Sequence, residues 1–107
     1  EERSGPESLG VIRVLMAASA HYRRSGEPAR ALELASRGDE IGSRITPPGT
    51  WLAAMASGEY GRALLAAART EQALPVLEGA RADLARTFGD ADARVEALDG
   101  AIASASP

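Results

Sequence analysis

The sequence predicts an all-α fold of about five helices in a single domain of 107 residues. Alanine, the best helix former, is the most frequent residue, with 23 copies. Valine and isoleucine together number eight, too few to build a sheet. Apolar residues recur every three or four positions between breaks made by glycine and proline. The chain has no cysteine, which excludes a disulfide scaffold and a thiolate zinc site.

The first helix is expected over about residues 7–25. Pro6 fits its first position, Glu7 favours the positive end of the helix dipole, and Gly26 breaks the helix. We expect residues 1–6 to form a flexible N-terminal segment. The apolar stripe of this helix consists of residues at helical spacing: Leu9, Ile12, Leu15, Ser19 and Tyr22.

The second helix is expected over about residues 27–45, with Pro28 near its start, so residues 7–45 make a first helical hairpin. Two prolines and a glycine then stop any helix, which makes residues 46–50 a loop. The apolar stripe of the second helix consists of Ala31, Leu34, Ala35, Gly38, Ile41 and Ile45.

The third helix is expected over about residues 51–68, with Thr50 as its N-cap. Gly58 and Gly61 lie inside it, and a helix keeps such costly glycines where something packs close. Its apolar face includes Trp51, Leu52, Met55, Tyr60, Leu64 and Leu65.

The fourth helix is expected over about residues 70–88, with Thr70 as its cap and Gly89 as its stop, so residues 51–89 make a second hairpin. Its stripe consists of Ala73, Val76, Leu77, Ala80, Leu84 and Phe88. A fifth helix, capped by Asp90 or Asp92, makes residues 90–107 a capping helix or a partial third unit. Its stripe consists of Val95, Leu98, Ala101 and Ile102.

The two hairpins are similar to each other at one constant spacing along the chain. Ala31 aligns with Ala73, and the residues that follow each of them are both leucine. At the same spacing upstream, Ser19 aligns with the equally small Gly61. A repeated helical hairpin buries its open face on the next unit. The spacing therefore predicts stacked hairpins.

These hairpins resemble tetratricopeptide repeats, in which small and large residues alternate at fixed places on two helices. The positions that match are Ser19, Tyr22, Gly26 and Ala31 in the first unit, and Gly61, Leu64, Ala73, Leu77 and Ala80 in the second. The resemblance covers residues 9–104 and implies a short right-handed superhelix. The period of about 42, in place of about 34, is typical of repeats in bacterial regulators. Gly38 and the Pro47-Pro48 loop depart from the family pattern.

The resemblance implies a concave face lined by the first helix of each unit, and hence a groove for a peptide. The residues placed there are Arg13, Met16, Arg23, Arg24, Met55, Arg62 and Leu65. Arginine pairs bidentately with carboxylates and methionine adapts to varied apolar side chains, so we expect an acidic or C-terminal peptide segment as partner. The alternative is that these arginines serve only solubility.

The residue types make an enzyme an unfavourable interpretation, and no cofactor or metal is expected. The chain has no lysine, one histidine and no Gly-x-Ser-x-Gly or Gly-x-Gly-x-x-Gly motif. The scattered carboxylates are expected to form a solvated surface. A net charge of −3 disfavours nucleic-acid binding, and no apolar run is long enough for a membrane span.

The expected function is non-catalytic protein or peptide binding, in a cytoplasmic bacterial protein whose abundant alanine and arginine indicate a high-GC genome. The chain lacks an initiator methionine, so we expect a piece of a longer regulatory polypeptide. Homodimerisation through the exposed end of the stack is a further expectation, because two units are few for independent stability. The alternative function is a small helical bundle that binds an apolar ligand between its helices.

Overall fold

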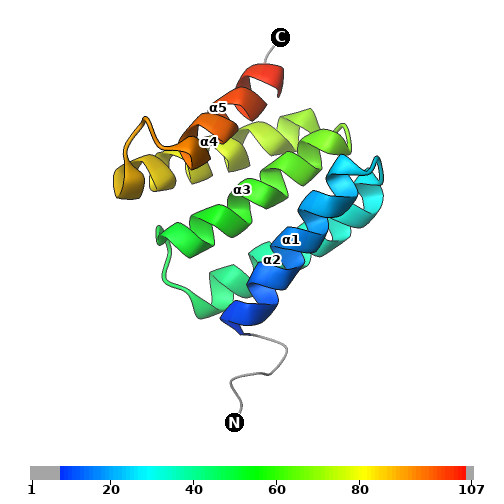
Figure 1. The fold of residues 1–107 in the computed structure, drawn as a ribbon, viewed down its shortest axis with the longest axis horizontal. Helices are drawn as coiled ribbons and strands as arrows, with labels where there is room; N and C mark the ends of the chain where they lie inside the picture. Colours follow the sequence, from blue (N-terminus) through cyan, green and yellow to red (C-terminus); the bar gives the residue numbers. More distant parts are fainter. Residues whose placement is uncertain (1–7, 106–107) are drawn as a thin grey trace.

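The computed structural model describes residues 8–105, which form five α-helices and no strand, as Figure 1 shows. The helices are α1 (Leu9–Arg24), α2 (Pro28–Ile45), α3 (Trp51–Ala66), α4 (Thr70–Phe88) and α5 (Ala93–Ala105). The predicted all-α fold of about five helices is confirmed. The segment 1–6 that we expected to be flexible lies outside the described residues.

The helices form two layers. α1 packs against α2, and α3 packs against α4. α3 also packs against α1 and α2, and α5 packs against both α3 and α4, whereas the backbones of α2 and α4 do not approach each other closely anywhere in residues 8–105. α1, α3 and α5 therefore make one layer, which we call the inner layer, and α2 and α4 make the outer layer behind it (Figure 1).

The turns that join α1 to α2 and α3 to α4 have the same hydrogen bonds. The backbone N–H of Glu27 donates to the carbonyl of Tyr22 at 2.9 Å. The N–H of Arg69 donates to the carbonyl of Leu64 at 2.8 Å. The two donors, and likewise the two acceptors, are separated along the chain by the same interval as Ala31 and Ala73. The two turns are therefore equivalent in structure at the positions that the sequence similarity aligns.

Both turns place one residue in the left-handed backbone region. Gly26 has a φ of 82°, and Ala68, at the equivalent position of the second turn, has a φ of 64°. Glycine adopts this region at no steric cost, whereas an alanine there is strained. The second turn therefore keeps the geometry of the first without the residue that best suits it.

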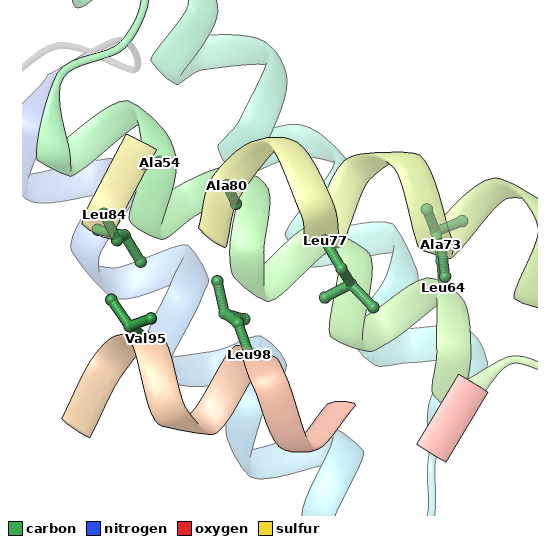
Figure 2. Packing of buried hydrophobic residues seen from close by; sticks show 8 residues of the cluster. All are labelled: Ala54, Leu64, Ala73, Leu77, Ala80, Leu84, Val95 and Leu98. Carbon is green, nitrogen blue, oxygen red and sulfur yellow. The ribbon is translucent and has the colours of Figure 1, made fainter. Parts of the chain in front are cut away.

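The largest hydrophobic cluster lies between α3, α4 and α5, and Figure 2 shows its members pointing toward one another. It consists of Ala54, Leu64, Ala73, Leu77, Ala80, Leu84, Val95 and Leu98. Gly61 lets α4 approach α3 closely, because a Cβ on it would lie 2.8 Å from Leu77. A second cluster joins α1 and α2 to the first half of α3 through Ile12, Leu15, Ile41, Leu52 and Ala56.

The fourth helix starts where it was expected, but the start of the first helix and the cap of the fourth differ from the expectation. α1 begins at Leu9, and its N-cap is Ser8, whose hydroxyl accepts a hydrogen bond from the N–H of Val11 at 3.2 Å. α4 begins at Thr70 itself, with Arg69 at the N-cap position. In both cases a turn or cap formed by a neighbouring residue decides the start.

Some residues of the expected stripes are exposed. Leu9 is 50% exposed, Ile45 is 36% exposed and Trp51 is 40% exposed, and each is the first or last residue of its helix. Conversely, α3 buries small residues that the stripe omitted, among them Ala56 and Ala63. α3 contacts all four other helices, so it is buried on several faces and has no single stripe.

Candidate functional site

The inner layer contains two adjoining hollows, which together we call the inner groove. The first, of about 280 Å³, is lined mainly by apolar side chains, among them Met16 from α1, Met55 from α3 and Leu98 from α5. The second, of about 420 Å³, is lined by Leu65 and by the second half of α5. Arg62 lines both hollows. The side chain of Arg62 thus belongs to the wall where the two hollows meet.

A buried polar network lies beside Arg62, and we call it the Ser19–Glu59–Arg23 network. The hydroxyl of Ser19, which is fully buried, donates to Oε2 of Glu59 at 2.8 Å. Arg23 donates to both carboxylate oxygens of Glu59, from Nε and from Nη2, each at 3.0 Å. The side chains of Arg23 and Glu59 are only 14% and 10% exposed. The network therefore ties α1 to α3 and neutralises its own two charges.

Arg62 lies one turn after Glu59 on α3, and its side chain has no hydrogen bond or salt bridge with any residue in 8–105. Burial lowers its pKa, repulsion from Arg23 and to a smaller extent from Arg24 lowers it further, and attraction to Glu59 opposes these effects. Because the ordinary pKa of arginine lies far above neutral pH, the group stays cationic. A half-buried cation that no described carboxylate contacts would be stabilised electrostatically by an anionic group placed beside it.

One rim of the inner layer carries a ladder of arginine and aromatic side chains from four helices. Arg13 lies over the ring of Trp51 at 5.6 Å, and Trp51 meets Phe88 edge to face at 6.5 Å. Arg94 lies over Phe88 at 3.6 Å. Such cation–π contacts each contribute about 0.5–1 kcal/mol at exposed sites. The ladder joins the start of α5 to the start of α3 and to α1.

Asp92 anchors the ladder at the start of α5. Its Oδ1 accepts the backbone N–H of Arg94 at 2.9 Å, and both carboxylate oxygens accept from the Arg94 side chain at 2.8 Å. The side-chain hydrogen bonds, and then the backbone one, lower the pKa of Asp92 to about 2. Of the two expected caps, Asp90 and Asp92, it is thus Asp92 that caps α5.

The structure brings together five of the seven residues predicted for the groove. Met16, Met55 and Arg62 line the first hollow, and Arg23, Leu65 and again Arg62 line the second. The remaining two, Arg13 and Arg24, line neither hollow: Arg13 lies over Trp51, and Arg24 is exposed on α1.

Glu59 and the part of the wall that α5 provides were not predicted from the sequence. The carboxylates were expected on a solvated surface, but Glu59 is nearly buried. A signal was available, because Glu59 stands three residues before Arg62 on the face assigned to the groove. The contribution of Arg94 and Leu98 has no such signal, because the docking of α5 is a tertiary contact.

Neither a metal-ligand cluster nor a membrane-spanning helix occurs in the described part of the chain. Within residues 8–105, no three histidine, aspartate or glutamate side chains are close enough together to hold a metal ion. In the same range, no helix is both long and apolar enough to cross a membrane.

Comparison with protein families, curated proteins and solved structures found no match. The fold and the groove thus define a small all-α module with an open, partly cationic groove, and function is inferred from that geometry.

Proposed function

We propose that the chain is a non-catalytic module, similar to tetratricopeptide repeats, that binds a protein or peptide segment in its inner groove. The partner segment carries an acidic side chain or a C-terminal carboxylate beside an apolar side chain. The observation that carries this proposal is Arg62, a half-buried cation that contacts no carboxylate among residues 8–105 and lies in the wall of an apolar hollow.

The chemistry of the wall fits such a segment. A guanidinium group presents parallel N–H donors that match the two oxygens of a carboxylate. Met16 and Met55 are flexible and polarisable, so they adapt to different apolar side chains. The guanidinium group of Arg62 would orient the carboxylate of the peptide, and the hollow would bury its apolar side chain. Binding sites commonly combine a few polar groups that set orientation with apolar walls that provide affinity.

The arrangement of the helices supports the repeat-like interpretation. The first helices of the two hairpins, α1 and α3, lie in the same layer, as the family resemblance implies for a concave face. The two hairpin turns have matching hydrogen bonds at equivalent positions of the two units.

A fluorescence-polarisation titration tests the proposal. The probes are fluorescein-labelled peptide pools with an apolar C-terminal residue, synthesised as free acids and as C-terminal amides. We expect the acids to bind, and Arg62→Gln to weaken them roughly 10- to 100-fold, because a hydrogen bond to a charged group contributes about 1.5–3 kcal/mol.

Arg37→Gln is the matched control for this titration. Arg37 is exposed on α2, in the outer layer, so its removal changes net charge equally without touching the groove. Equal binding by Arg62→Gln and Arg37→Gln would contradict the proposal, because Arg62 would then contribute only to solubility, as an exposed arginine does.

A second candidate function is the binding of an apolar small molecule between the helices. The observation that favours it is the first hollow, of about 280 Å³, with largely apolar walls. A thermal-shift screen with uncharged apolar compounds separates the two functions. Stabilisation by such compounds that survives in Arg62→Gln supports this candidate over carboxylate recognition.

We also propose that the chain self-associates into a homodimer through the exposed end of the stack, at the first hairpin, where α1 leaves apolar side chains exposed. Leu9 is 50% exposed and Val14 is 67% exposed. Sedimentation at high concentration tests this, and a monomer there contradicts it. The place of the chain in a cytoplasmic bacterial regulator stays a prediction.

A further inference from the structure

We propose that the Ser19–Glu59–Arg23 network sets the charge preference of the inner groove, by keeping Glu59 away from Arg62. This inference rests on the proposed function, in which Arg62 binds the carboxylate of a peptide. It makes Arg23 a positioning residue that acts through Glu59, rather than a residue that contacts the ligand.

Glu59 and Arg62 stand at positions where side chains ordinarily pair. Residues three apart on a helix are neighbours, and opposite charges there attract each other. The side chain of Glu59, which also lines the first hollow, nevertheless makes all of its hydrogen bonds to α1, with Ser19 and Arg23. Glu59 is therefore paired with Arg23 and Ser19 instead of Arg62, and the guanidinium group of Arg62 stays available for the carboxylate of a ligand.

The network holds Glu59 firmly, because turning it toward Arg62 would break three hydrogen bonds. Two of them come from one guanidinium group in the bidentate arrangement, which is stronger and more directional than a single contact. The third comes from Ser19, whose fully buried hydroxyl would be left without its partner. Low exposure of Arg23 and Glu59 also reduces screening by solvent.

The charge balance of the groove follows from this arrangement. Arg23 and Glu59 offset each other, so Arg62 provides the unpaired charge where the two hollows meet, and the exposed Arg24 adds positive charge nearby. Without Arg23, Glu59 is an internal carboxylate that competes with the ligand for Arg62. The groove would then lose its preference for carboxylate ends over amides.

Arg23→Gln tests the inference. We expect the titration with free-acid peptides to show roughly 10-fold weaker binding or more, because Glu59 now occupies Arg62. The double variant Arg23→Gln/Glu59→Gln removes the competitor, and we expect binding to return to within about threefold of the parent chain. Arg37→Gln is the matched control, since it also removes one positive charge, but from an exposed position on α2 that lines neither hollow.

A second readout needs no ligand. The side-chain Nε–Hε NMR signal of Arg62, assigned by its loss in Arg62→Gln, reports whether the group has gained a carboxylate partner. We expect this signal to shift in Arg23→Gln and to return in the double variant. Thermal unfolding confirms that each variant is folded. If Arg23→Gln is not folded, Arg23→Lys keeps the charge without the bidentate geometry and gives a smaller shift in the same direction.

Three results separate the possible failures. A free-acid pool that does not bind the parent chain contradicts the proposed function, while the NMR signal still tests the network. An unshifted Arg62 signal in Arg23→Gln or Arg23→Lys overturns the inference. A double variant that binds as weakly as Arg23→Gln also overturns it, because Arg23 would then contact the ligand directly.

Discussion

The two hairpin turns allow a pair of opposite substitutions, Gly26→Ala and Ala68→Gly. Both residues have a positive φ, of 82° and 64° respectively, and both are exposed. A Cβ on Gly26 would meet no atom within 4 Å, so the first substitution changes backbone energy without a packing clash. The pair therefore isolates the cost of the left-handed conformation at equivalent places in the two units.

The magnitude follows from two opposing terms. The left-handed region costs a residue with a Cβ about 1–2 kcal/mol. Alanine recovers about 0.4–1 kcal/mol of this relative to glycine, because its unfolded chain has fewer conformations. We therefore expect Ala68→Gly to stabilise the fold by about 0.5–1 kcal/mol, and Gly26→Ala to destabilise it by a similar amount.

Urea denaturation followed by circular dichroism measures both free energies of unfolding, and thermal unfolding provides a second measure. A change of about 1 kcal/mol shifts the midpoint temperature by roughly 4–8 °C in a domain of this size. The double variant, which exchanges the two residues, should unfold near the parent midpoint because the sites are distant. Loss of stability in Ala68→Gly would refute the shared turn geometry, because glycine would then only add unfolded-state entropy.

Two further predictions concern packing and acid stability. Gly61→Ala should destabilise by about 1–3 kcal/mol, because its Cβ would overlap Leu77, whereas Gly79→Ala, with open space around it, should stabilise by about 1 kcal/mol in urea denaturation. Equal effects would contradict the close contact of α3 and α4. The carboxylate of Asp92 has its pKa lowered to about 2 from 3.8, so it stabilises the fold above pH 3.8, and this contribution is lost as the pH falls toward 2. Asp92→Asn should flatten the fall in the free energy of unfolding between about pH 4 and pH 2, and an unchanged slope would contradict the contact with Arg94.

The helices were predictable because their ends depend on local residues. Gly26 and Gly89 stop α1 and α4 through positive φ values, and the prolines after α2 end it. The buried face of α4 followed from helical spacing, since Ala73, Leu77, Ala80 and Leu84 are all buried. Spacing works for a helix with one buried face.

The central helix could not be predicted in the same way. α3 contacts every other helix, so its small residues are buried on several sides and its periodicity is weak. Thr50 occupies the predicted N-cap position of α3, but its hydroxyl donates to the carbonyl of Pro47 at 2.9 Å and makes no cap hydrogen bond. The choice between these two bonds depends on the path of the loop.

Most of the residues that line the groove could be predicted from the sequence, but the ion pair between Arg23 and Glu59 could not. Helical spacing and the repeat resemblance placed Met16, Met55 and Arg62 together, and they share one hollow. Which arginine would be neutralised depends on the exact approach of α1 to α3. In the structure Glu59 pairs with Arg23 of α1. Helical spacing alone would equally allow Glu59 to pair with Arg62 on α3.

The central claim is that the inner groove binds a carboxylate-bearing peptide, and the chain offers two direct reporters of it. Met16 and Met55 are its only methionines, and both line the first hollow. The measurement is a ¹³C-methyl NMR titration of the methionine-labelled chain with the peptide pool that binds best as a free acid, and with the same pool as amides. We predict that both methyl signals shift with the acid, and that the amide needs at least a roughly tenfold higher concentration for the same shift. Methyl signals that stay in place while the acid binds, or that shift equally with acid and amide, would contradict the claim.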